Sequence, residues 1–133
     1  MLEKHSSQSV LIVNEDPDVL ILLSSMLQRN GFRVLFARNS REAVEITARH
    51  YIPVDLIVCD VLVDGESGDL LARGLRKLRP AMRELYLSTA TDEGAIRIRV
   101  VKQTEGGGFA PSSDLNFIDQ VRNSLSPPMH MSA

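Results

Sequence analysis

Apolar residues occur in two kinds of spacing along the chain, and the two kinds alternate. Short unbroken apolar runs, each followed by polar or turn-forming residues, are typical of strands that are buried on both faces of a parallel sheet. Between these runs, apolar residues recur at helical spacing. The pattern predicts strands within residues 10–13, 34–37, 54–60, 85–87 and 109–110.

The predicted helices have recognisable starting signals. Pro17 suits a first helical turn, and Asn39 with Glu42 three residues later resembles a capping box. In the fourth segment Ile96 and Val100 share one helical face, although charged residues surround them. We expect helices over about residues 17–30, 40–50, 68–79, 92–104 and 115–125.

The order of elements is strand then helix, repeated five times. Such alternation with short connections is typical of an α/β fold, a doubly wound parallel sheet with helices on both faces. No repeat or long linker divides the chain, so we expect a single domain over 1–133, with its core at about 9–125 and a frayed tail at 126–133.

Composition narrows the class of protein. The chain has 133 residues, of which 44% are hydrophobic and 24% charged, a globular balance. Its net charge of −2 gives no reason to expect direct contact with nucleic acid, and no apolar run is long enough to cross a membrane. The single cysteine, Cys59, lies in an apolar run; we expect an inert core thiol and a cytoplasmic protein.

Acidic side chains follow two of the predicted strands. Glu15 and Asp16 come after the first strand, Asp60 ends the third, and Thr89 follows the fourth. Because the carboxyl ends of parallel strands meet at one edge of a sheet, we expect these groups to converge there. Crowded carboxylates favour Mg²⁺, and a metal-screened aspartate is a plausible phosphoryl acceptor. The plainer alternative is that Asp60 only caps the following turn.

The same residues resemble the receiver domain of bacterial two-component response regulators over about 9–125. Members of that family have an acidic cluster before Pro-Asp, for which residues 13–18 stand here as Val-Asn-Glu-Asp-Pro-Asp. They have a phosphoacceptor Asp with a Gly eight residues later, matched by Asp60 and Gly68, and a Thr-Ala pair matched by Thr89 and Ala90. The resemblance implies a flavodoxin-like five-stranded fold.

The resemblance also implies roles for individual residues. The chain would be a signalling module rather than an enzyme, and Asp60 would accept a phosphoryl group from a histidine kinase or phosphotransfer protein. Thr89 and Ala90 would bind the phosphate, with Ser88 as the alternative if the register slips by one, and Phe109 would be the switch aromatic. The Mg²⁺ ligands would be Glu15, Asp60 and the carbonyl of Leu62, with Asp16 or Asn14 acting through water.

Several positions depart from the family pattern. Asn14 replaces the first acid, and no lysine follows Phe109, where Ala110-Pro111-Ser112 stands instead. We therefore keep a second hypothesis, a pseudo-receiver that acts as a phosphorylation-independent interaction or dimerisation module. A small enzyme or nucleotide binder is the third alternative, and no glycine-rich loop supports it. A homodimer would use the fourth and fifth predicted helices.

Overall fold

The computed structural model describes residues 7–112 and 115–126, so most of the predicted tail at 126–133 lies outside the described residues. The helices are α1 (Pro17–Arg29), α2 (Ser40–Ala48), α3 (Gly68–Leu78) and α4 (Phe117–Leu125). The strands are β1 (Ser9–Val13), β2 (Arg33–Ala37), β3 (Leu56–Asp60), β4 (Leu62–Val63), β5 (Glu66–Ser67), β6 (Arg83–Asp92), β7 (Ala95–Gln103) and β8 (Phe109–Pro111).

Six of the strands form one sheet in the order β2-β1-β3-β6-β7-β8. The neighbours from β2 to β6 pair in parallel, whereas β7 pairs antiparallel with both β6 and β8. Strands β4 and β5 make a separate small hairpin directly after β3. The predicted doubly wound α/β fold is confirmed, and the parallel part has the strand order of flavodoxin-like proteins.

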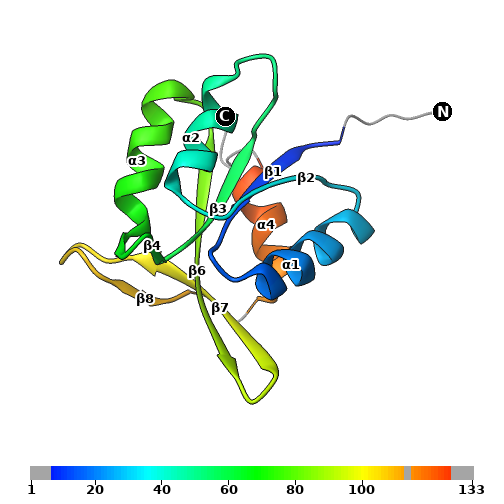
Figure 1. Cartoon of the computed structure of the whole chain (residues 1–133), viewed down its shortest axis with the longest axis vertical. Helices are drawn as coiled ribbons and strands as arrows, with labels where there is room; N and C mark the ends of the chain where they lie inside the picture. Colours follow the sequence, from blue (N-terminus) through cyan, green and yellow to red (C-terminus); the bar gives the residue numbers. More distant parts are fainter. Residues whose placement is uncertain (1–6, 113–114, 127–133) are drawn as a thin grey trace, which may run out of the picture.

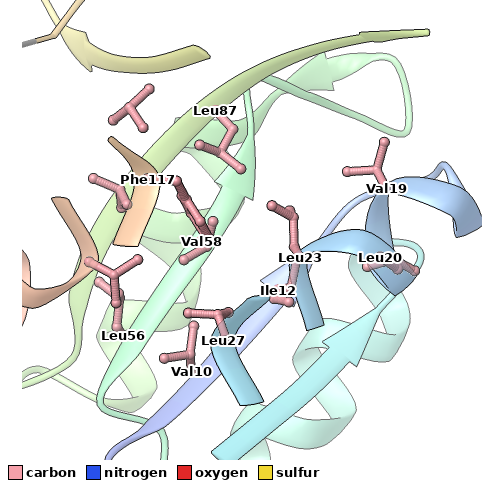
Figure 2. Packing of buried hydrophobic residues seen from close by; sticks show 13 residues of the cluster. Val10, Ile12, Val19, Leu20, Leu23, Leu27, Leu56, Val58, Leu87 and Phe117 are labelled. Atoms are coloured by element: carbon pink, nitrogen blue, oxygen red, sulfur yellow. The ribbon is translucent and has the colours of Figure 1, made fainter. Parts of the chain in front are cut away.

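Helices cover both faces of the sheet (Figure 1). Helices α1 and α4 pack on one face, where the labelled side chains of Figure 2 meet across β1, β3 and β6. Helices α2 and α3 pack on the other face against a second apolar cluster, which includes the buried Cys59. Every residue of β1 is buried, as the unbroken apolar run of a central strand predicts.

The helix predicted over 92–104 is wrong, because this segment forms the antiparallel hairpin of β6 and β7. The residues from Ile96 to Val100 alternate apolar with charged side chains, which is the period of a strand. Glu93 and Gly94 form the turn, and both have positive φ angles of 51° and 83°. This is the backbone conformation of a tight two-residue hairpin turn.

The hairpin also changes two further predictions. The expected fifth strand exists as β8, but β7 lies between it and β6, so the sheet has six strands rather than five and is not wholly parallel. A homodimer through the fourth and fifth predicted helices is not available in that form, because the fourth of them is β7 and only the fifth exists, as α4.

Gly68 is the position where the fold has no room for a side chain. A Cβ added there would lie 2.0 Å from the carbonyl oxygen of Asp60 and 3.1 Å from Sγ of Cys59. The amide of Gly68 also donates a 2.7 Å hydrogen bond to the carbonyl of Val61. Helix α3 therefore begins directly against the end of β3, and glycine makes this approach possible.

Two glycines of α3 should respond to alanine in opposite directions. Gly68→Ala should lower the free energy of unfolding by roughly 1–3 kcal/mol or more, because backbone must move to make space. Gly74→Ala is the matched control: nothing lies within 4 Å of its added Cβ. It should be stabilising by about 0.5–1 kcal/mol, since alanine favours the helix. Urea denaturation measures both, and a Gly68→Ala protein as stable as the wild type would contradict the predicted close approach.

Candidate functional site

Asp60 ends β3 with its carboxylate half-buried at the carboxyl edge of the sheet. Its Oδ1 accepts a 3.1 Å hydrogen bond from the hydroxyl of Thr89 on β6. Burial raises the pKa of Asp60 to about 6, and the charge of Glu15 adds to this effect, whereas hydrogen bonds from Thr89 and from the Val61 backbone oppose it. At neutral pH the carboxylate is therefore mostly ionised, yet held in an unfavourable environment.

Asn14 extends this contact into a chain of three polar groups. Its side-chain amide donates to the Thr89 hydroxyl at 3.4 Å, and that hydroxyl in turn donates to Asp60. The other end of the Asn14 side chain accepts a 2.9 Å hydrogen bond from the backbone of Asp16. Asn14 is only 2% exposed, so an amide at this position has both of its polar ends satisfied. A carboxylate there could not donate to Thr89.

Glu15 and Asp16 are hydrogen-bonded to other parts of the molecule. Glu15 Oε2 accepts a 2.8 Å hydrogen bond from the backbone of Asp64, in the turn between β4 and β5. Asp16 caps α1 by accepting from the backbone of Asp18, and it accepts a 2.9 Å hydrogen bond from the Thr91 hydroxyl. This bond from Thr91 is the main reason why the pKa of Asp16 is lowered.

The predicted convergence of carboxylates is incomplete in this conformation. Among the described residues, no three His, Cys, Asp or Glu side chains lie close enough together to hold a metal ion. Glu15 and Asp60 do influence one another electrostatically. Leu62 lies in β4, where it pairs with Ser67 of β5. The oxygen ligands suit Mg²⁺ in their chemistry, and one of them, Oε2 of Glu15, is occupied by the Asp64 amide in this conformation.

Thr89, rather than Ser88, places its hydroxyl at Asp60. Because side chains alternate along β6, Ser88 points to the opposite face of the sheet from Thr89. Its neighbour there in the strand register is Arg99 of β7. Ala90 is exposed and pairs with Arg97. The structure therefore brings Asn14, Thr89 and Asp60 together, and leaves Ala90 on the other side of the strand.

On the strand next to Thr89, the residue opposite it is apolar. Ile98 of β7 lies opposite Thr89, whereas Arg97 and Arg99 alternate onto the other face. The Arg97 guanidinium forms an ion pair with Asp92, 3.2 Å from its carboxylate oxygen. Lys102 lies farther along β7, opposite Ala110 of β8 in the strand register. No arginine or lysine of β7 therefore replaces the missing lysine beside Thr89, and the IRIR alternation was the sequence signal for this arrangement.

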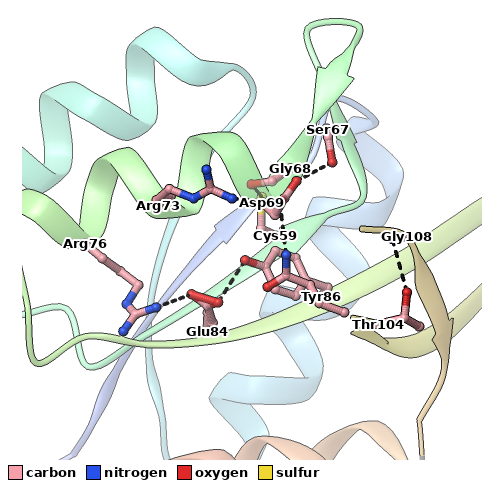
Figure 3. A network of polar contacts seen from close by, with 11 residues as sticks. Cys59, Ser67, Gly68, Asp69, Arg73, Arg76, Glu84, Tyr86, Thr104 and Gly108 are labelled. Atoms are coloured by element: carbon pink, nitrogen blue, oxygen red, sulfur yellow. Dashed lines mark hydrogen bonds and ion pairs between the residues drawn. The ribbon is translucent and has the colours of Figure 1, made fainter. Parts of the chain in front are cut away.

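Phe109 lies away from Thr89, in the edge strand β8. Its ring is tilted against that of Tyr86, with 5.1 Å between the centroids. Figure 3 shows Tyr86 within a polar network that joins α3 to the sheet: its hydroxyl donates to Glu84, which also binds Arg76. Burial is the main reason why the pKa of Tyr86 is raised. Phe109 is thus part of the packing beneath α3 and does not contact the Thr89 hydroxyl.

Asp69 is the second centre of the network in Figure 3. Its Oδ1 accepts from the Ser67 hydroxyl, and its Oδ2 accepts from Gln103 of β7 at 3.0 Å and lies 3.5 Å from Arg73. These contacts hold the start of α3 against the far end of β7. Sequence reasoning gave Asp69 and Gln103 no role, because their contact joins residues distant in the chain.

Comparison with protein families agrees with this geometry. Residues 10–105, most of the chain, match the family described as response regulator receiver domain. The chain belongs to this family. Its members are signalling modules of two-component systems, as the sequence resemblance predicted.

Individual relatives of this receiver domain are distant. It is 30% identical over 83 residues to an uncharacterised transcriptional regulatory protein, YbdJ of Bacillus subtilis, a match that covers 62% of this chain and 35% of YbdJ. The chain therefore spans about a third of that relative's length. No helix in the described part of the receiver is long and apolar enough to cross a membrane.

Two solved structures show receivers with a ligand or modification. The response regulator TrrA of Thermotoga maritima, in complex with Mg²⁺ and a beryllium fluoride, is 27% identical with a TM-score of 0.51, over 58% of this chain and 65% of that one. A response regulator of Burkholderia pseudomallei has a phosphorylated aspartic acid and a calcium ion. It is 26% identical with a TM-score of 0.57, over 67% and 52% of the two chains.

The electrostatic environment of Asp60 makes a prediction about stability. The folded-state pKa of about 6 lies above the ordinary value of 3.8. The folded protein thus binds the proton more tightly than the unfolded chain, and this stabilisation, fully present below about pH 4, is lost as the pH rises through 6. Asp60→Asn keeps an acceptor for Thr89 without the charge. With chelator present, it should melt at a higher temperature than wild type at pH 7.5 and at a similar one at pH 4.

Glu66→Gln is the control for loss of one negative charge at an exposed position near the same loop. It should not reproduce the pH dependence. A lower melting temperature for Asp60→Asn at pH 7.5 would mean that the ionised carboxylate stabilises the fold, contrary to the burial argument.

Proposed function

We propose that Asp60 is a phosphoacceptor that receives a phosphoryl group from a histidine kinase or phosphotransfer protein. The observation that supports this most is the half-buried Asp60 carboxylate with the Thr89 hydroxyl at 3.1 Å, at the carboxyl edge of the sheet. In the transfer, an oxygen of Asp60 attacks the phosphorus, the bond from phosphorus to the donor's imidazole nitrogen breaks, and the electron pair leaves with the imidazole.

Residues of this chain have distinct tasks in that step. Asp60 must be ionised to attack, and a pKa of about 6 leaves most of the population ionised at neutral pH. The Thr89 hydroxyl, now bound to Asp60, is placed to donate to an oxygen of the incoming phosphoryl group instead. The Asn14 amide contacts that hydroxyl at 3.4 Å and positions it. The phosphate-binding role of Ala90 and the switch role of Phe109 rest on the family resemblance alone, since neither side chain lies at the Thr89 hydroxyl in this conformation.

We further propose that Mg²⁺ assists at this edge of the sheet. The ligands would be Glu15, Asp60 and the carbonyl of Leu62, with Asp16 or Asn14 acting through water. When bound, the metal would screen the negative charge that gathers between the carboxylates and the phosphoryl oxygens. Because no three acidic side chains of the described residues converge here, and Oε2 of Glu15 accepts from the Asp64 amide, we expect weak binding.

A second candidate function has its own supporting observation. Ile98 occupies the position opposite Thr89 and offers no cation to a phosphorylated Asp60. A phosphoryl group adds roughly −1.5 to −2 charges at pH 7, and an apolar neighbour does not compensate them. A pseudo-receiver, which binds a protein partner without being phosphorylated, is therefore the alternative.

Mass spectrometry separates the two functions. After incubation with Mg²⁺ and a small acyl phosphate, the wild-type protein should gain roughly 80 Da, one HPO₃ group. The gain should be absent from Asp60→Asn and present in Asp64→Asn, which removes an exposed aspartate of the neighbouring turn. Absence of the adduct from wild type, with a known receiver phosphorylated in parallel, would favour the pseudo-receiver.

A further inference from the structure

Strand β2 is an edge of the sheet with open hydrogen-bonding groups. Among the described residues it pairs only with β1. The Arg33 amide donates to the Gln8 carbonyl, and the Ala37 carbonyl accepts from Asn14. Because bonding alternates along a parallel strand, the amide and carbonyl groups of Val34 and Phe36 point away from β1. The opposite edge, β8, has only three residues and includes Pro111, which is a common protection against further pairing.

An apolar groove lies directly beside this edge. It has a volume of about 590 Å³ and runs between α1 and β2, which lie side by side in Figure 1. Ile21 of α1 is 68% exposed and Phe36 of β2 is 57% exposed, and both line the groove. The buried hydroxyl of Ser24, another lining residue, has no hydrogen-bond partner in the described part of the chain. Exposed apolar side chains gathered in this way are typical of a binding surface.

An arginine side chain lies at each end of β2. Arg33 begins the strand, and its side chain forms no ion pair within the described residues. Arg38 follows the strand; its side chain is 63% exposed and lies 3.6 Å from Glu42. Four residues lie between the two arginines, whose backbone positions are five residue steps, about 17 Å, apart. An extended segment with an acidic residue near each end would match this spacing.

We propose that the outer edge of β2 and the groove beside it bind an extended segment of a partner protein. The segment adds a strand to β2 through the outward groups of Val34 and Phe36. Its alternate side chains, on the face of α1, are apolar and enter the groove, and its acidic ends meet Arg33 and Arg38. This surface does not include Asp60, so the proposal stands independently of phosphorylation.

A second copy of the chain fits the same edge less well. Two β2 strands paired antiparallel about a two-fold axis at Leu35 would place Arg33 of each copy beside Ala37 and Arg38 of the other. Each end of the pairing would then hold two arginines, and like charges across a strand pair are destabilising. The charges therefore favour a foreign, acidic segment.

Fluorescence polarisation with a labelled peptide tests the proposal. The probe has six residues, so that its two ends are as far apart as Arg33 and Arg38, with glutamate at each end and isoleucine alternating with threonine between them. It should bind saturably at micromolar concentration and more weakly at high salt. A peptide with lysine at both ends should bind more weakly, since it meets Arg33 and Arg38 with like charge. No saturable binding of the glutamate peptide up to millimolar protein would overturn the proposal.

Variants locate the binding on β2. Val34→Pro removes an outward amide, which an edge strand tolerates, and should weaken binding roughly tenfold. Because the Val34 side chain also packs against the apolar cluster beneath α1, this variant must show the circular dichroism spectrum of the wild type. Phe36→Ala removes one wall of the groove and should weaken binding similarly, with an unchanged circular dichroism spectrum as evidence of folding. Leu70→Ala, at a 52% exposed leucine of α3, is the matched control and should bind normally. Normal binding by both Val34→Pro and Phe36→Ala would contradict the proposal.

Light scattering on the protein alone tests whether a second copy of the chain, rather than a foreign segment, occupies the edge of β2. A monomer agrees with a foreign partner. A concentration-dependent dimer that Val34→Pro abolishes would show that a second copy occupies the edge, and would overturn the choice of partner.

Discussion

The cost of holding the Asp60 carboxylate half-buried at the end of β3 governs the structure around it. Burial raises its pKa to about 6, and the nearby charge of Glu15 adds to the cost. Hydrogen bonds are the compensation: Thr89 donates to Asp60, and Asn14 donates to Thr89. In such a series of hydrogen bonds each group polarises the next, so Asn14, Thr89 and Asp60 stabilise one another as a network rather than as separate pairs.

The backbone around Asp60 is equally constrained. Strand β6 extends beyond Leu87, the residue opposite the end of β3, and this extension carries the Thr89 and Thr91 hydroxyls that bind Asp60 and Asp16. Helix α3 must begin with a glycine, because its first residue lies against the Asp60 carbonyl. The same edge of the sheet thus combines a half-buried carboxylate of raised pKa with close backbone packing. Perturbed pKa values of this kind are common at functional sites.

The hairpin of β6 and β7 is the main departure from the doubly wound pattern. Strand β7 takes the place next to β6 and moves β8 to the edge of the sheet. One consequence is chemical, because Ile98 now faces Thr89 where the family resemblance leads one to expect a lysine nearby. Another is that Phe109 packs on Tyr86 instead of lying beside Thr89. A signal at Asp60 would therefore pass first to the hairpin, through Thr89, rather than to a helix.

Much of the fold was predictable from local patterns in the sequence. The apolar runs of β1 and β3, the proline of α1 and the Asn39 cap of α2 all act over a few residues, and the structure contains each of these elements. The segment from 92 to 104 was misread because Ile96 and Val100 also fit a helical face. Its strict alternation and the Glu93-Gly94 turn were the better evidence.

The sequence was enough to predict which residues belong to the site, but not which of them contact one another. Asp60, Thr89 and Asn14 meet because the ends of neighbouring strands meet, and strand order follows from the pattern of elements. The position of Glu15 does not follow in this way. Its carboxylate accepts from the Asp64 amide, in the turn between β4 and β5, and this contact between residues 49 positions apart is not visible in the residue spacing.

Titration of the Asp60 carboxyl carbon by NMR tests the central claim most directly. In the metal-free wild-type protein, the resonance should report a pKa of about 6. In Thr89→Val, which keeps the shape of the side chain and removes the hydroxyl, the pKa should rise further, because the carboxylate loses its donor. A wild-type pKa near the ordinary 3.8, or a pKa that Thr89→Val leaves unchanged, would contradict the account.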